Sequence, residues 1–133
     1  MFEFRLDGSA SVYEQIYNEI SRLISVGALK ADERLPSVRD VAKSLGVNPN
    51  TVQKSYAMLE RGGLIYSIPA KGSYVASDGS AAETARRAAE AALAEAMRKA
   101  EAAGVTRQAA LSRLNEVWEN DTGNEKDNSR RKE

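Results

Sequence analysis

Residues 35–75 read LPSVRDVAKSLGVNPNTVQKSYAMLERGGLIYSIPAKGSYV, and this stretch decides the fold. Ser37 is followed three positions later by Asp40, a helix-start pattern in which side chains bind free backbone N–H groups. Apolar residues then recur at helical spacing and give this helix one apolar face: Val38, Val41, Ala42 and Leu45. Gly46 ends the helix, because glycine accepts a positive φ without steric cost.

A second helix is predicted to begin only two residues later, at Asn48 and Pro49. The Asn48 side chain can accept from the first backbone N–H groups of the helix, and proline suits the first helical position. Val52, Tyr56 and Leu59 give this helix its buried stripe. Two helices joined by so short a turn cross steeply, and this predicts a helix-turn-helix.

A small β-ribbon follows the second helix. Gly62 and Gly63 end the helix, and residues 64–68 and 73–75 predict two short strands. The connection between them, residues 69–72, carries a lysine at its tip. The pattern predicts a mainly α fold with a small β-wing, a winged helix-turn-helix.

The outward face of the second helix is polar. Asn50, Thr51, Gln53 and Lys54 lie on or beside its N-terminal exposed side, if the apolar stripe faces inward. Amide and hydroxyl groups both donate and accept hydrogen bonds, as base edges in the major groove require. Residues 35–75 hold five basic and two acidic residues, whereas the whole chain balances 19 basic against 19 acidic residues. This local excess of positive charge favours DNA binding.

Less specific interpretations of the same residues stay open. Capping alone explains Asn48, and Arg39 in the first helix suits a solvated charge as well as a phosphate contact. Lys71 and Gly72 fit an ordinary hairpin turn as well as a wing that enters the minor groove.

Three motifs resemble the DNA-binding domain of the GntR family of bacterial transcription regulators: LPSVRDVAKSLGVNPNTV, LERGGLIY and KGSYV. The upstream VYEQIYNEI looks like the YtrA subfamily. The resemblance implies DNA contacts at the first helix, at the start of the second helix and at the wing tip, and the corresponding residues are Arg39, Asn48, Asn50, Thr51, Gln53, Lys71 and Gly72. One departure is the stretch 30–34, KADER, where relatives usually have a Pro-Gly turn.

The residues before this stretch predict a short strand and a long helix. Phe2, Phe4 and Leu6 alternate with charged residues, as in a half-buried strand. Ser11 and Glu14 form a capping box. The apolar residues that follow have helical spacing as far as Gly27, and this helix is expected to complete a three-helix core: Val12, Ile16, Ile20, Leu23 and Ile24.

The residues after the wing predict a helical hairpin for dimerisation. Residues 81–103 are rich in alanine and favour one long helix, Gly104 ends it, and Thr106 caps a last helix. Neither helix has enough apolar surface to be stable alone. We therefore expect association with a second copy through five residues: Leu93, Met97, Leu111, Leu114 and Trp118. The YtrA resemblance also implies a homodimer.

The expected organisation has three parts. Residues 1–76 form the winged helix-turn-helix domain and residues 77–120 the two-helix dimerisation region, while residues 121–133 are polar, lack a period and are expected to be disordered.

Composition excludes several classes of function. The chain has no cysteine and no histidine, and neither a cluster of acidic ligands nor a phosphate-binding glycine motif is present. We expect no enzymatic activity and no cofactor. The sequence has neither a signal peptide pattern nor an apolar run long enough for a membrane span, so a soluble cytoplasmic protein is expected. Fewer than sixty residues follow the wing, too few for a usual effector domain, although a small molecule could bind at the dimer junction.

The leading functional hypothesis is a dimeric, sequence-specific transcription repressor that binds a pseudo-palindromic DNA operator. The alternative is a winged helix that serves as a protein-interaction module without sequence-specific DNA binding. Retention on DNA at low salt, with release as salt is added, separates the two.

Overall fold

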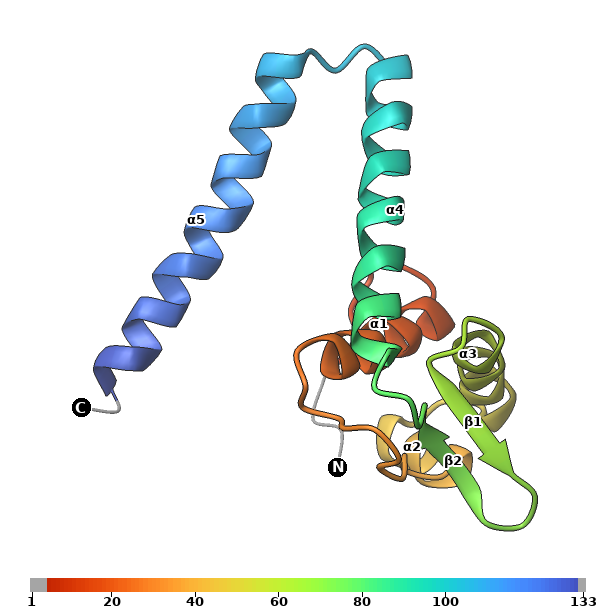
Figure 1. The fold of residues 1–133 in the computed structure, drawn as a ribbon. Helices are drawn as coiled ribbons and strands as arrows, with labels where there is room; N and C mark the ends of the chain where they lie inside the picture. The colour runs from red at the N-terminus through yellow and green to blue at the C-terminus, as the bar shows by residue number, and fades with distance from the viewer. Residues whose placement is uncertain (1–4, 132–133) are drawn as a thin grey trace. The chain divides into compact units, whose positions relative to one another are not determined.

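The computed structural model describes residues 5–131, with side chains as far as residue 119. Contacts divide the chain into two compact units, residues 1–89 and residues 90–133. The elements in chain order are shown in Figure 1: α1 (Val12–Ser25), α2 (Val38–Leu45), α3 (Pro49–Arg61), β1 (Ile65–Ile68), β2 (Gly72–Val75), α4 (Ala81–Ala102) and α5 (Arg107–Arg131). The predicted class, mainly α with a small β-wing, is confirmed.

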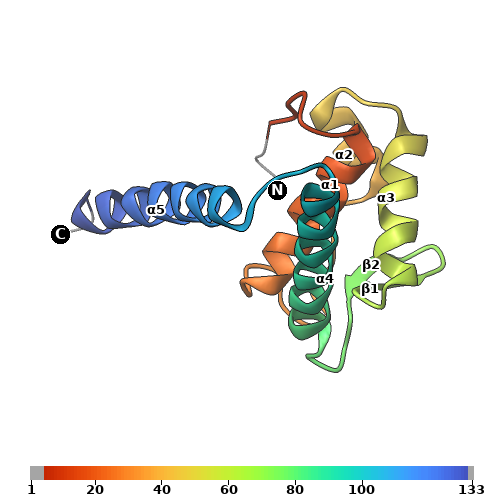
Figure 2. The same ribbon diagram turned by 90° about the horizontal axis from the view of Figure 1, so that it is seen from above.

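Three helices enclose the core of the first unit. α3 packs against both α1 and α2, and β1 follows directly on α3 (Figure 2). The predicted stripe of α3 is buried, and so are Ile16, Ile20 and Ile24 of the α1 stripe, whose Val12 and Leu23 are half-buried. The strands add one apolar face of the hairpin. The residues with at most 3% of their surface exposed include Ile16, Ile20, Ile24, Val41, Val52, Tyr56, Leu59, Leu64, Ile65 and Val75. This core brings together residues from both sides of the helix-turn-helix.

The ends of α2 and α3 are capped as predicted. The Ser37 Oγ accepts from the backbone N–H of Asp40 at 3.0 Å, and Gly46 has a left-handed φ of 68°. The Asn48 Oδ1 accepts from the Asn50 N–H at 2.8 Å, with Pro49 in the first turn. Local sequence therefore determines where both helices begin and how they turn.

The start of α1 differs from the predicted capping box. Ser11 precedes the helix, but its side chain makes no capping hydrogen bond. The Gln15 side chain reaches back instead: its Oε1 accepts from the Asp7 N–H at 2.8 Å, and its Nε2 donates to the carbonyl of Ala10 at 2.7 Å. The longer amide side chain thus holds the residues before α1, which explains why a serine cap is dispensable here.

The wing is an antiparallel hairpin whose register pairs Ile65 with Val75 and Ile68 with Gly72. Its turn is closed by the Lys71 N–H, which donates to the Ile68 carbonyl at 3.0 Å. The strands span residues 65–68 and 72–75, whereas the sequence predicts 64–68 and 73–75. Each strand therefore begins one residue from its predicted start and ends where predicted.

Residues 32–35 run beside β2 as a third, irregular edge. The Asp32 N–H donates to the Val75 carbonyl, the Val75 N–H to Glu33, and the Leu35 N–H to Ser73, each at 2.8–2.9 Å. Asp32 has a φ of 64° and so makes the turn that relatives are expected to make with Pro-Gly. Aspartate is among the residues that tolerate this conformation best.

The first unit extends beyond the predicted boundary at residue 76. Ala81 and Ala85, in the first turns of α4, have at most 4% of their surface exposed and belong to the core cluster. α4 begins beside α1 in both ribbon views (Figures 1 and 2). The contact-based boundary lies between Ala89 and Glu90, within α4.

The last helix extends into the segment for which the sequence predicts a disordered tail. Thr106 caps α5 as expected, with its Oγ1 accepting from the Ala109 N–H at 3.1 Å. α5 then continues to Arg131, through residues 121–131 that were expected to lack structure. No proline interrupts this segment, and extending an existing helix requires far less than starting one, so absence of an apolar period does not end it.

Two further expectations from the sequence concern the N-terminal strand and membrane-spanning helices. The predicted strand begins at Phe2 and Phe4, which lie outside the described residues. Among the helices of residues 5–131, none combines the length and apolar composition of a membrane span.

Candidate nucleic-acid interface

The N-terminal turn of α3 presents polar side chains to solvent. Asn48, Asn50 and Gln53 are exposed, whereas Val52 on the opposite side of the helix is fully buried. Thr51 is half-buried, between the exposed and the buried face. The backbone N–H groups of this turn are bound by Asn48, so the exposed amide side chains are the groups that can read hydrogen-bonding partners.

Tyr56 fixes α3 to the beginning of α2. Its hydroxyl donates to the carbonyl of Pro36 at 2.6 Å, and only 3% of the residue is exposed. Burial raises the pKa of Tyr56 strongly, and the negative charge of Asp40 raises it further. The phenol therefore stays neutral and keeps its hydrogen bond over the whole physiological range.

Ser55 ties α3 to α1, a role that the sequence pattern does not predict. Its side chain is completely buried, and its Oγ donates to the carbonyl of Tyr13 at 2.7 Å. A buried hydroxyl needs such a partner. The available signal was its position: Ser55 lies three residues after Val52, on the side of α3 that faces the core.

Lys54, one of the predicted DNA-binding residues, contacts α1. Its Nζ lies 3.8 Å from the centre of the Tyr13 ring, a cation–π distance. Tyr13 thus accepts a hydrogen bond from Ser55 at its backbone carbonyl, and its ring contacts the ammonium group of Lys54. Lys54 remains exposed but is directed along the α1 side of α3.

Arg39 lies in the first turn of α2, and its side chain is exposed. α2 packs against α3, so the structure places Arg39 and the start of α3 in the same helix-turn-helix. Asp40, the next residue, is exposed and has its backbone N–H bound by Ser37.

The wing supplies the last two predicted residues. Lys71 is exposed in the hairpin turn, and Gly72 is half-buried at the start of β2 with a φ of 128°. A side chain at Gly72 would meet the guanidinium of Arg34, whose Nε lies 3.0 Å from the position of a Cβ atom. Arg34 ends the polar connection of residues 28–34, where the sequence favours a solvated side chain and leaves a contact with the phosphate backbone open.

A hydrogen bond holds the base of the wing. The Tyr66 hydroxyl donates to the Asp32 carboxylate at 2.8 Å, and the Tyr66 and Tyr74 rings stack with centres 5.5 Å apart. Hydrogen bonds from Ser77 and then from Tyr66 hold the pKa of Asp32 below its usual value. The carboxylate is therefore charged at neutral pH and keeps the edge segment attached to the hairpin.

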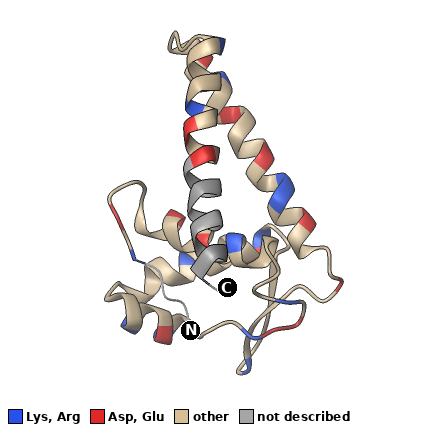
Figure 3. Ribbon diagram, turned by 90° about the vertical axis from the view of Figure 1, so that its left-hand side faces the viewer, with Lys and Arg blue, Asp and Glu red and all other residues tan. Residues whose placement is uncertain are grey.

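Basic residues elsewhere in the chain are often paired with acidic ones. Acidic and basic residues are interspersed along α4 (Figure 3), where Arg86 and Arg87 both bind Glu83 and Arg98 binds Glu95. These pairs are exposed and contribute little to stability. They also offset the positive charge that α4 would otherwise present.

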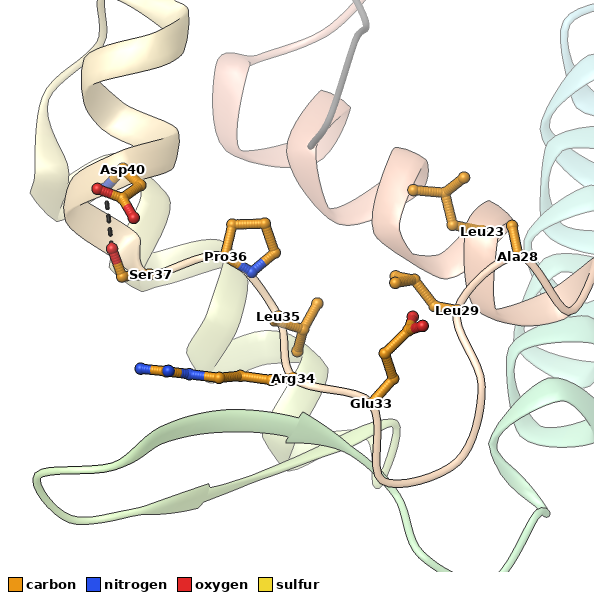
Figure 4. Close-up of a pocket in the computed structure, with 9 residues that line it drawn as sticks. All are labelled: Leu23, Ala28, Leu29, Glu33, Arg34, Leu35, Pro36, Ser37 and Asp40. Atoms are coloured by element: carbon orange, nitrogen blue, oxygen red, sulfur yellow. Dashed lines mark hydrogen bonds between the residues drawn. The ribbon is translucent and has the colours of Figure 1, made fainter.

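An open hollow of about 690 Å³ lies between the end of α1 and the beginning of α2 (Figure 4). The charged residues of its lining are Glu33, Arg34 and Asp40. The remaining lining residues are Leu23, Ala28, Leu29, Leu35, Pro36 and Ser37. The Arg34 side chain extends away from Glu33 and along the hairpin.

The predicted dimerisation residues are exposed within the single chain. Between 41% and 58% of their surface is accessible in Leu93, Met97, Leu111, Leu114 and Trp118. The DNA-binding candidates thus all lie in the first unit, while the apolar candidates of α4 and α5 are exposed.

Comparisons with known proteins agree with this geometry. Residues 12–75 match the model of the family described as "Bacterial regulatory proteins, gntR family". The HTH-type transcriptional repressor YtrA of Bacillus subtilis is 42% identical over 67 residues, which cover 50% of this chain and 52% of that protein. The chain therefore spans about half the length of this curated relative.

Two solved structures are similar over most of the chain. A GntR family transcriptional regulator from Listeria monocytogenes superposes with a TM-score of 0.66 at 29% identity, covering 84% of this chain and 98% of that one. YtrA from Sulfolobus acidocaldarius, a GntR-family transcription factor, gives a TM-score of 0.50 at 30% identity, covering 90% of this chain and 97% of that one. On its matching motifs, its fold and these relatives, the chain belongs to the GntR family.

Proposed function

We propose that this chain is a sequence-specific DNA-binding transcription regulator that reads its site with the N-terminal part of α3. The observation that carries the proposal is the division of α3 into a buried apolar stripe and an exposed amide face, with Asn50 and Gln53 on the exposed face. Asparagine and glutamine can each form two hydrogen bonds with an adenine edge in the major groove.

The roles of the other residues follow from their chemistry. Arg39 binds phosphates and sets the register of the protein on the duplex. Thr51 contacts the duplex at the border of the exposed face. Lys71 at the wing tip lies against the backbone or the minor groove. Asn48 acts first as the cap of α3 and only secondarily as a phosphate ligand.

The named relatives support regulation of transcription rather than an enzymatic role. YtrA of Bacillus subtilis is a transcriptional repressor, and YtrA of Sulfolobus acidocaldarius is a transcription factor. We accordingly propose repression, which requires only that the bound protein obstruct a promoter.

The active form is proposed to be a homodimer. The five predicted apolar residues of α4 and α5 are exposed, and helices of this composition need packing against a partner to be stable. Small alanine side chains along α4 allow a close approach by another helix. A two-fold axis then presents two α3 helices to two half-sites of a pseudo-palindromic operator.

DNA binding measured against salt tests the proposal. The purified protein is expected to bind a labelled duplex of mixed sequence at low salt and to be released as salt increases, with a linear decrease of log K against log salt concentration. Gln53 and Asn50 replaced together by alanine should keep this nonspecific binding but lose the preference for a selected site. Binding that is absent at every salt concentration would favour a winged helix that contacts proteins.

A further inference from the structure

Arg34 lies on the outer face of the wing. Its backbone forms an antiparallel bridge with Tyr74, so the two side chains share one face of the hairpin. Leu35, the next residue, points to the opposite face and is buried with only 2% of its surface exposed. The alternation along this edge therefore sends the arginine outward.

The Arg34 side chain extends from the base of the wing toward its tip. Its backbone is level with Tyr74, but its guanidinium lies over Gly72, two residues closer to the turn. Gly72 leaves this space open, since a Cβ there would lie 3.0 Å from the Arg34 Nε. Lys71, the next residue toward the turn, is the cation that the sequence assigned to the wing.

The positive charge of Arg34 is not neutralised within the described part of the chain. Arg34 is exposed and forms no ion pair with any carboxylate among residues 5–119. The Asp32 carboxylate accepts from Tyr66, and Glu33 extends in the other direction (Figure 4). The Arg34 guanidinium lies against the backbone of the wing, is exposed and pairs with no carboxylate of residues 5–119. It is therefore available to bind an external anion.

We propose that Arg34 is a DNA-contacting residue of the wing and supplies, beside Lys71, a second cation to the DNA backbone. This inference rests on the proposed DNA-binding function. Gly72 would then act by keeping open the path of the guanidinium, in addition to any direct approach of its own backbone to DNA. Arginine suits this place because its guanidinium is weakly hydrated and binds phosphate oxygens in pairs.

The test compares three variants by fluorescence anisotropy on a labelled duplex of mixed sequence, over a series of salt concentrations. Arg34→Gln is expected to bind several-fold more weakly at low salt and to reduce the slope of log K against log salt by about 1. Arg34→Lys keeps the charge and should keep the slope. Arg22→Gln is the matched control: it removes the same charge from α1, where Arg22 is paired with Glu19 at 2.7 Å, and should leave the slope unchanged.

Thermal unfolding followed by circular dichroism separates this role from a structural one. If Arg34 only packs on Gly72, both Arg34 variants lower the melting temperature and neither changes the salt slope, and the inference is overturned. It is overturned as well if Arg34→Gln and Arg22→Gln reduce the slope equally. A wild-type protein without salt-dependent binding would instead overturn the proposed function, and this inference with it.

Discussion

Tyr56 is a buried ionisable residue of the helix-turn-helix. Its hydroxyl donates to the Pro36 carbonyl, and burial followed by the charge of Asp40 raises its pKa. The pKa of a tyrosine in the unfolded chain is near ~10. Because the pKa of Tyr56 is higher in the folded state, its protonated phenol stabilises the fold at pH values below about 10, and this stabilisation is lost as the pH rises further. The stability of the winged domain is therefore expected to fall in alkali.

Replacement of Tyr56 by phenylalanine tests this linkage. Tyr56→Phe removes the hydrogen bond to Pro36 and should lower the free energy of unfolding by about 1 kcal/mol near neutral pH. The variant has no phenol to ionise, so it should lose less stability than the wild type between about pH 9 and about pH 11. Urea unfolding at several pH values measures both. A stability difference that does not change with pH would contradict the assignment.

Gln53 is the residue expected to discriminate bases. Gln53→Ala should weaken binding to a selected operator by about 1–3 kcal/mol while binding to unrelated DNA stays nearly unchanged, because phosphate contacts remain. Competition between the two duplexes measures the change. Asn18→Ala, which removes an exposed amide from α1, is the control and should retain full preference. If the wild type, Gln53→Ala and Asn18→Ala all show the same preference for the operator, Gln53 does not contact bases.

At the scale of the element, the turn of the wing contains a strained residue. Ala70 has a φ of 66°, and the Lys71 N–H donates across it to the Ile68 carbonyl with Pro69 in the first central position. This is the arrangement of a type II turn, in which glycine or asparagine usually occupies the Ala70 position. The side chain of an alanine there costs about 1–2 kcal/mol.

Ala70→Gly should consequently stabilise the first unit. Relief of the side-chain clash exceeds the entropy that glycine loses on folding, and a net gain of up to about 1 kcal/mol is expected. The same change at Ala88, an exposed position in α4, should destabilise by about 1 kcal/mol. Thermal unfolding of the two variants should therefore move in opposite directions; a shift of the same sign in both would show that the turn is not strained.

Elements that depend on local signals were predictable from the sequence. Caps and glycines define α2 and α3, and both lie within a residue of their expected bounds because Ser37, Gly46 and Asn48 act on their own backbone neighbours. The start of α1 was predicted, but its cap was not: nothing in local spacing distinguishes Ser11 from Gln15, which binds groups up to eight residues away.

Contacts between distant segments were not predictable in the same way. Ser55 became a candidate only when the fold placed it beside Tyr13, and the position of Arg34 over Gly72 could not be read from the sequence. The extension of α5 to Arg131 was missed because a polar, aperiodic stretch looks alike as helix and as coil. By contrast, the polar residues at the start of α3 could be predicted, because the helical spacing of its apolar stripe defines which side of the helix is exposed.

At the scale of the whole molecule, the exposed apolar residues of the second unit predict self-association. Leu114→Glu places a charge in the proposed helix–helix contact and should convert a dimer into a monomer in analytical ultracentrifugation. Asn115→Glu, a change at the neighbouring exposed position, should leave the dimer intact. A wild-type chain that sediments as a monomer at every concentration would contradict this part of the proposal.

Selection of bound sites from a pool of random duplexes tests the central claim, that paired α3 helices read DNA sequence. The wild-type protein is expected to enrich two inverted half-sites whose centres lie about 10 base pairs apart, or a multiple of that spacing. Gln53→Ala should enrich a site that is relaxed at one position in each half. A pool that shows no enriched sequence after selection, from a protein that still binds DNA, would contradict it.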